Sequence, residues 1–294
     1  ADIKSLFFGL DKSVLIDHKP LKGSINTKVN LEPVSVEFKE SNLLLANLPL
    51  SVLGKVAVLE KGIDFDLDIK SKNASLENLF SLVPKEYQQW YDGMIFKGTS
   101  NIDFLLKGLM QDSVSNPNLN LKIAIANGTI AAKQFQDLPV ENLQAITELN
   151  LPKLNPDSLK VNVTNFAFNL GKGFAKGKVL YQFPTFVDAA VDANLNITQL
   201  WQTLAISGMQ LKGDLALSGS AKGNYTTQQS INKQGVVTSK IIETPTFNVN
   251  AHWEKGYFKW TEMPLAITDL SFNLNAENTN GDYKNTFVDI QNID

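Results

Sequence analysis

GMIFKGTSNIDFLLKG, from Gly93 to Gly108, and GMQLKGDLALSGSAKG, from Gly208 to Gly223, are two versions of one sequence phrase. They align without a gap at a constant offset, since 208 − 93 = 115 and 223 − 108 = 115. A constant offset over many residues is typical of a repeated supersecondary unit. The phrase therefore predicts that the chain contains at least two related structural units.

The likeness continues on both sides of this phrase. Upstream, SLENLFSLV (Ser75–Val83) resembles NITQLWQTL (Asn196–Leu204). Downstream, NPNLNLKIAIANG (Asn116–Gly128) aligns with TPTFNVNAHWEKG (Thr244–Gly256), and the proline and the final glycine keep the same spacing in both. The motifs thus follow one another in the same order in both copies, as expected of two whole units.

A partial third copy lies near the N-terminus. KESNLLLANLPL (Lys39–Leu50) aligns with EKGYFKWTEMPL (Glu254–Leu265), and one proline of each segment falls at the same position. We therefore expect a partial first repeat over residues 1–64, a second repeat over 65–186 and a third over 187–294. Together these are expected to form one continuous β-repeat domain, a fragment of a longer protein.

Apolar and polar residues alternate along most of the chain. In GIDFDLDIK (Gly62–Lys70) the apolar residues alternate with three aspartates, and residues 119–125, 189–195 and 270–274 follow the same pattern. Successive side chains of a strand point to opposite faces, so each segment has one apolar and one polar side. The sequence predicts a mainly β fold, an antiparallel sheet of tandem meanders with one solvated face.

Glycine dipeptides and one change of phase interrupt this alternation. The dipeptides, which we expect to form hairpin turns, are Lys61-Gly62, Asn127-Gly128, Lys255-Gly256 and Asn280-Gly281. In SLKVNVTNFAFNL (Ser158–Leu170) the apolar residues move from odd to even positions, which predicts a β-bulge near Thr164-Asn165. Residues 227–239 are mostly polar and are expected to form a flexible hairpin loop.

Two segments have helical rather than strand periodicity. One runs from Ser75 to Asp92 and the other from Asn196 to Ala205, and each precedes a GM-x-x-KG phrase. Apolar residues three and four apart predict short amphipathic helices, in which Trp90 and Trp201 pack onto the sheet. Each repeat is thus expected to contain one short helix followed by a meander.

The composition excludes several classes of function. The chain has 294 residues and a net charge of −3, so it lacks the basic field that attracts nucleic acid. It contains no cysteine, which excludes disulfides and thiolate metal sites. No run of 18 apolar residues is present, and any signal or membrane anchor of the parent protein is expected outside this chain.

No group of residues indicates a catalytic, metal or cofactor site. The two histidines are far apart in sequence, and His252 lies on the polar side of its strand, as is typical of a surface residue. Asp64, Asp66 and Asp68 stand about 6.8 Å apart along a strand, too far to surround one calcium ion. GKGFAKGK (Gly171–Lys178) has neither the spacing nor the Ser or Thr of a phosphate-binding P-loop. We expect no enzyme.

The motifs resemble those of the AsmA family, especially its Bacteroidetes-type members. The resemblance is carried by a short helix followed by SLVPKEYQQWYDGMIFKGTSNIDFLLKG (residues 81–108), NPNLNLKIAIANGTI (116–130) and DLPVENL (137–143), and it covers nearly the whole chain from about Leu44 onward. AsmA-like proteins are envelope proteins of Gram-negative bacteria, anchored in the inner membrane and extended into the periplasm. The resemblance implies an elongated, strongly curved antiparallel sheet whose apolar side is a groove for phospholipid acyl chains.

The resemblance and the one-sided strands together predict lipid binding in the periplasm, with a role in outer-membrane assembly. The expected partners are phospholipid or another acyl-chain lipid, envelope proteins, and the inner membrane through an anchor absent from this chain. The candidate lipid contacts are Phe65, Leu67, Ile69, Leu119, Leu121, Ile123, Phe247, Val249 and Phe272. The alternative is a structural scaffold with a self-packed core that binds envelope proteins through its sheet edges. The sequence leaves open whether the helices close the groove.

Overall fold

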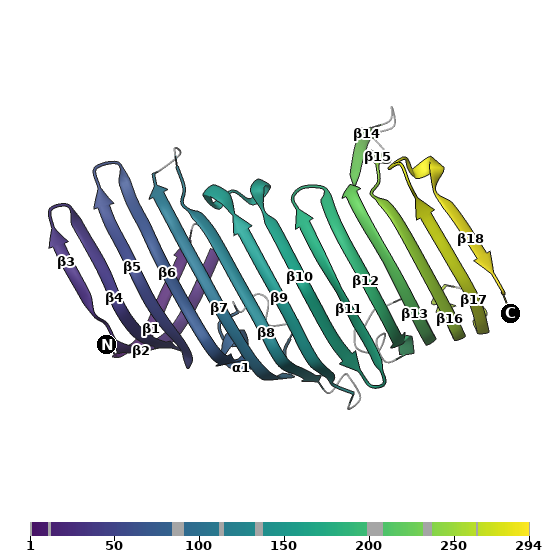
Figure 1. Cartoon of the computed structure of the whole chain (residues 1–294), viewed down its shortest axis with the longest axis horizontal. Coiled ribbons are helices and arrows are strands. Elements are labelled where there is room, and N and C mark those ends of the chain that lie inside the picture. Colours follow the sequence, from purple (N-terminus) through teal and green to yellow (C-terminus); the bar gives the residue numbers. More distant parts are fainter. Residues whose placement is uncertain are drawn as a thin grey trace. The chain divides into compact units, whose positions relative to one another are not determined.

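The protein is built almost entirely from antiparallel β-strands (Figure 1). The computed structural model describes residues 2–10, 13–83, 91–111, 115–132, 138–198, 208–231, 237–262 and 264–293. Within these ranges, sixteen strands belong to one sheet that is not closed, and two more form a separate hairpin. The chain divides into two compact units: unit 1 comprises residues 1–133 and 141–160, and unit 2 comprises 134–140 and 161–294. The predicted mainly β class is confirmed.

The described residues of unit 1 form the N-terminal strands and one short α-helix. Its strands pair in the order β1-β2-β4-β5-β6-β7-β8-β9, and β3 pairs with β4 beside this path. Their bounds are β1 (Asp2–Leu10), β2 (Ser13–Ser24), β3 (Thr27–Leu31), β4 (Val34–Leu45), β5 (Leu48–Leu59), β6 (Gly62–Ser75), β7 (Met94–Met110), β8 (Asn118–Ala132) and β9 (Val140–Leu151). The helix α1 (Leu76–Phe80) joins β6 to β7, and two short 3-10 turns, η3 (Pro152–Leu154) and η4 (Pro156–Ser158), follow β9.

Unit 2 repeats the pattern of long antiparallel neighbours. Its strands pair in the order β10-β11-β12-β13-β16-β17-β18. Their bounds are β10 (Lys160–Leu170), β11 (Gly173–Gln182), β12 (Phe186–Asn196), β13 (Met209–Asn224), β16 (Thr246–Trp260), β17 (Ile267–Asn278) and β18 (Phe287–Gln291), with the 3-10 turn η5 (Tyr283–Asn285) before β18. Between β13 and β16 the chain forms the separate hairpin of β14 (Thr226–Ile231) and β15 (Val237–Glu243).

The polar segment 227–239, predicted to be a flexible hairpin loop, lies in that hairpin and contributes to both of its paired strands. Thr227 pairs with Ile241 and Gln229 with Ser239, so backbone hydrogen bonds order residues whose side chains offer little to bury. Residues 232–236 lie outside the described part of the chain. Polarity therefore identified a segment outside the main sheet but did not reveal its pairing.

The first predicted helix is confirmed in position but described over a shorter stretch. Ser75 caps α1, because its hydroxyl accepts a hydrogen bond of 3.2 Å from the Asn78 amide. Residues 84–90, which include Trp90, lie outside the described residues. In the second predicted helix, Ile197 and Thr198 are helical, while residues 199–207, which include Trp201, lie outside them.

Two of the four predicted turns lie inside strands, so that part of the prediction is wrong. Asn127 in β8 and Lys255 in β16 have φ of 52° and 51°, and each is followed by glycine. The pairing register shifts at both places, between Lys97 and Thr99 on β7 opposite β8, and between Trp253 and Gly256 on β16. A β-bulge accommodates one extra residue with positive φ while the strand continues, so the same dipeptide serves a bulge as well as a turn. The other two dipeptides, at residues 61–62 and 280–281, lie where strands end, as predicted.

The expected bulge in β10 stays a prediction. The strand runs without interruption from Lys160 to Leu170, and the adjacent side chains of Thr164 and Asn165 are both exposed. Phe166 and Phe168 then pack against a buried cluster that contains Leu170.

Backbone conformations agree at the positions that align in the two sequence phrases. Gly98 on β7 has φ 112° and Gly213 on β13 has φ 118°. A Cβ would lie 2.7 Å from the Asn127 carbonyl oxygen at the first site and 2.6 Å from the Glu254 carbonyl oxygen at the second. Both glycines thus lie opposite a bulge on the neighbouring strand, where a side chain has no room.

Replacing Gly98 by alanine is predicted to destabilise the protein by about 2–4 kcal/mol. The left-handed φ is unfavourable for an L-residue, and the added Cβ would overlap the Asn127 carbonyl. Urea unfolding followed by circular dichroism measures the change. Gly93→Ala is the matched control, because nothing lies within 4 Å of its Cβ, and it should cost only about 1 kcal/mol. Equal losses in the two variants would contradict the proposed close approach.

Candidate functional site

One face of the unit 1 sheet is lined by side chains in register, all of them apolar except the buried Ser71. The rows, each running from β6 through β7 to β8, are Leu67–Leu106–Leu119, Ile69–Phe104–Leu121 and Ser71–Ile102–Ile123. Phe65 precedes these rows on the same face of β6, opposite Gly108. The structure therefore places the six candidates predicted in this unit on one face, because residues two apart on a strand and directly opposite pairs share a face.

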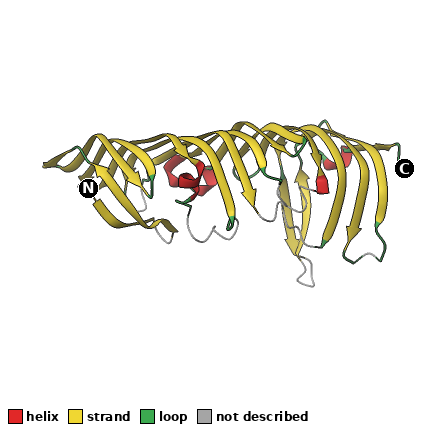
Figure 2. Cartoon of the chain, turned by 90° about the horizontal axis from the view of Figure 1, so that it is seen from below, coloured by secondary structure: helices red, strands yellow, loops and turns green. Residues whose placement is uncertain are grey.

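The helix α1 covers part of this face (Figure 2). Leu79 and the following Leu82 pack against a buried cluster of Leu48, Ala74 and Ile102. At the end of α1, the ring of Phe80 stacks on Phe96 of β7, with centroids 3.8 Å apart. In unit 1, hydrocarbon from the chain itself thus occupies some of the surface that a ligand would need.

Unit 2 presents a broader apolar face, again in register. Its rows, each running from β12 through β13 and β16 to β17, are Leu195–Leu215–Trp253–Phe272, Ala193–Leu217–Ala251–Leu274, Val191–Gly219–Val249–Ala276 and Ala189–Ala221–Phe247–Asn278. The last row ends in the polar Asn278, which is buried. The three remaining candidates, Phe247, Val249 and Phe272, therefore share one face. All three are half-buried, so each keeps some surface in contact with solvent.

An apolar hollow of about 250 Å³ interrupts this face. It lies where small residues meet across strands: Ala189 on β12 is opposite Ala221 on β13, and Gly219 is opposite Val249 on β16. The rest of its lining consists of Phe166, Val179, Ala190, Val191, Leu217 and Ser220. Because alanine and glycine leave room beside larger neighbours, the hollow follows directly from the order of small and large residues.

The sequence interpretation missed several members of the two faces. On β7 and β13 the apolar residues are consecutive, as in Phe104-Leu105-Leu106 and Leu215-Ala216-Leu217, so alternation does not reveal which residues face which side. The strand register resolves this, since it places Leu106 beside Leu67 and Leu217 beside Ala193. The alternation on the neighbouring strand, combined with the pairing register, thus determines which residues of these runs lie on the apolar face.

The opposite face of the sheet is polar and carries paired charges. Asp66 lies 2.9 Å from Lys107, and Asp68 lies 2.9 Å from Lys70. In unit 2, Asp192 similarly lies 3.1 Å from Lys176. The aspartates that alternate along β6 therefore belong to a solvated face, as predicted, where such exposed pairs add little stability.

His252 lies on the polar face of β16 and has partners on both ring nitrogens. Its Nδ1 is 2.7 Å from Asn273 Oδ1, and its Nε2 is 2.7 Å from Glu254 Oε1. The hydrogen bond to Glu254, followed by the hydrogen bond to Asn273, raises the pKa of His252, because both acceptors favour the protonated ring. The predicted surface histidine is thus held in a fixed orientation.

Two other kinds of feature are absent from the described residues. No group of three or more His, Asp or Glu side chains in this part of the chain is arranged to hold a metal ion. No helix within the described ranges is both long and apolar enough to cross a membrane. The two faces of the sheet are therefore the surfaces from which a function can be inferred.

Comparison with known proteins gives no match. The chain matches no protein-family model, no curated protein and no solved structure. The AsmA resemblance therefore rests on the sequence motifs alone, and the function has to be inferred from the molecule's own geometry.

His252 is predicted to titrate above its ordinary pKa of 6.5. The stability that its protonated ring adds is present below pH 6.5 and is lost as the pH rises through the raised pKa. An NMR titration of the imidazole protons measures the midpoint. Glu254→Gln removes the charged partner and should return the midpoint toward 6.5, whereas the same midpoint in both proteins would contradict the assigned cause.

Proposed function

We propose that this protein binds the acyl chains of lipids on the apolar face of its sheet and catalyses no reaction. The observation that carries this proposal is the set of apolar rows in unit 2, which extend in register across β12, β13, β16 and β17. Leu195 is buried, but the other large apolar side chains of these rows are only half-buried. Covering this water-exposed apolar surface with hydrocarbon lowers the free energy of the protein and ligand in water.

The gain in free energy is large enough to retain a lipid. An acyl chain that buries about 400 Å² gains on the order of 10 kcal/mol at roughly 25 cal/mol per Å². The loss of translational and rotational freedom offsets part of this gain, and the remainder sets the affinity. The hollow beside Ala189 and Ala221 accepts methylene groups and offers them almost entirely apolar contacts.

We also propose that the chain is organised as tandem repeats. We interpret residues 65–186 and 187–294 as tandem repeats after a partial repeat over 1–64, which is supported by the matching φ of Gly98 and Gly213. The resemblance to the AsmA family supports a curved sheet with a groove, phospholipid as the ligand, and a periplasmic location in a Gram-negative bacterium. It also supports an inner-membrane anchor on the parent protein and a role in outer-membrane assembly.

A structural scaffold is the second candidate function. It is favoured by α1, whose Leu79 packs on the apolar face of unit 1, and by the edge strand β18. On β18, Phe287, Val288 and Ile290 are each at least 50% exposed, which suits a strand that adds to the sheet from another protein. In this case the apolar face would be self-packed and would not take up fatty acid.

Ala221→Trp is predicted to weaken acyl-chain binding at least ten-fold. The indole would fill the apolar hollow, since Ala221 lies opposite Ala189 in its lining. Fluorescence anisotropy of a BODIPY-labelled fatty acid, titrated with protein, measures the affinity. Lys222→Trp is the matched control, because this exposed neighbour on β13 lies outside the lining of the hollow and its side chain points to the polar face.

The outcomes separate the two candidate functions. Binding by the unaltered protein and by the Lys222 variant, with loss in the Ala221 variant, supports the acyl-chain site. Saturable binding that the Ala221 variant retains would contradict the assigned hollow. The absence of fatty-acid binding by the unaltered protein would favour the self-packed scaffold.

A further inference from the structure

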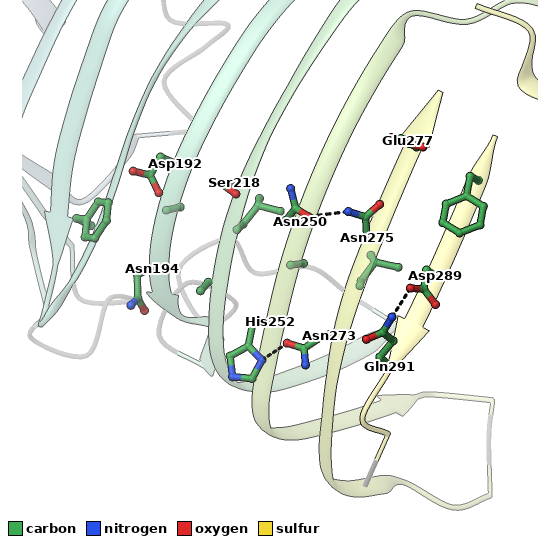
Figure 3. A pocket seen from close by; sticks show the side chains of 17 residues that line it. Asp192, Asn194, Ser218, Asn250, His252, Asn273, Asn275, Glu277, Asp289 and Gln291 are labelled. Carbon is green, nitrogen blue, oxygen red and sulfur yellow. Dashed lines mark hydrogen bonds between the residues drawn. The ribbon is translucent and has the colours of Figure 1, made fainter. Parts of the chain in front are cut away.

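The polar face of unit 2 contains a depression of about 780 Å³ on the side of the sheet opposite the apolar hollow (Figure 3). Two neighbouring rows of side chains form it. One row contains Asn194, Ala216, His252, Asn273 and Gln291, and the other contains Asp192, Ser218, Asn250, Asn275 and Asp289. These residues come from β12, β13, β16, β17 and β18, so the depression spans several neighbouring strands.

Differences in side-chain size account for the depression. Its floor on β13 is formed by Ala216 and Ser218, which are short. On the adjoining strands they face Asn194 and Asp192 on one side and His252 and Asn250 on the other. The longer side chains of β12 and β16 stand on either side of the short ones of β13 and leave a polar depression between them.

Hydrogen bonds hold the lining side chains in fixed orientations. Asn275 Nδ2 donates to Asn250 Oδ1 at 2.8 Å, and Asn250 Nδ2 donates to Asn248 Oδ1 at 2.9 Å (Figure 3 shows the first contact). His252 is fixed in the same way by Asn273. An array of amides both donates and accepts hydrogen bonds, which matches the hydroxyl groups of a polyol, since each hydroxyl also does both.

Two exposed phenylalanines lie on the strands at either end of the depression. Phe174 on β11 is in the row of Asn194 and His252 and is 37% exposed, and Phe287 on β18 lies opposite Glu277 and is 56% exposed. Five strand spacings of about 4.8 Å separate β11 from β18, or roughly 24 Å. An exposed aromatic ring offers a flat apolar surface to the C–H face of a sugar ring, and this separation suits a chain of several rings.

The charges of the depression select against anions. Asp192, Glu277 and Asp289 contribute carboxylates, of which Asp192 is paired with Lys176 at 3.1 Å. The positive charge of His252, when its ring is protonated, is balanced by Glu254 at 2.7 Å. Carboxylates accept hydrogen bonds from hydroxyls but repel phosphate, sulfate and uronate groups. The chemistry of the lining therefore favours an uncharged ligand.

We propose that this depression binds a neutral oligosaccharide. Amides and carboxylates contact the hydroxyls, while Phe174 and Phe287 contact the sugar rings at the ends. Because the depression and the apolar hollow lie on opposite faces of β13, the two sites are chemically separate. The glycan site stands whether or not the apolar face binds lipid.

The test is a binding screen of the whole chain with maltoheptaose, cellohexaose and chitohexaose as probes, monitored by 15N–1H NMR and isothermal titration calorimetry. At least one probe should bind with a dissociation constant in the millimolar range or tighter and shift the resonances of Asn250, Asn273 and Asn275. Oligogalacturonate of similar length should not bind. A probe concentration of about 10 mM detects even weak sites. If none of the neutral probes shifts these resonances at that concentration, the proposal is overturned.

Ser218→Trp fills the floor of the depression and is expected to reduce binding at least ten-fold. Its matched control is Ser239→Trp, since Ser239 is exposed on β15, in the separate hairpin. Both variants are expected to unfold at the same urea concentration as the unaltered protein, and neither should change fatty-acid affinity. Equal glycan affinity in the two variants would place the binding elsewhere and contradict the proposal.

Discussion

Neighbouring strands must pair so that their apolar residues lie on the same face of the sheet. The rest of this structure depends on that constraint. A slip of one residue would move an apolar side chain such as Val249 to the polar face. The bulge at Lys255 prevents such a change of face on β16. Trp253 before the bulge and Phe258 after it differ in parity, yet they lie opposite Leu215 and Leu211, which are four residues apart on β13. The extra residue therefore keeps both aromatic rings on the apolar side.

Much of this arrangement could be predicted from the sequence, because period-two alternation of apolar and polar residues is specific to β-strands. It gave the β class and the shared face of residues such as Phe65 and Leu67. The capped helix before β7 was also visible in its spacing. The dipeptides at 127–128 and 255–256 were misassigned, because glycine after a residue with positive φ suits a turn and a bulge equally. Only the pairing partner distinguishes the two, and the partner lies on another strand.

The candidate sites show the same limit. Phe247 and Phe272 were predicted from their own strands, but the hollow between the strands depends on Ala189 meeting Ala221, a contact set by register. The polar depression was not foreseen at all. Asn194, Asn250 and Asn273 are ordinary surface residues in sequence and form a surface only when β12, β16 and β17 are brought together in one sheet. Local patterns thus reveal which face a residue occupies, while cavities require the neighbours of each strand.

The central claim, that the apolar face shelters hydrocarbon, is tested most directly by native mass spectrometry of the protein purified from a Gram-negative host without detergent. The account predicts adducts with the masses of phospholipids, which dissociate on collisional activation and are depleted in a variant with Val249→Lys but not in one with Asn248→Lys. These neighbouring residues of β16 face opposite sides of the sheet. Protein that is free of lipid in repeated preparations, or adducts that both variants retain equally, would contradict the account.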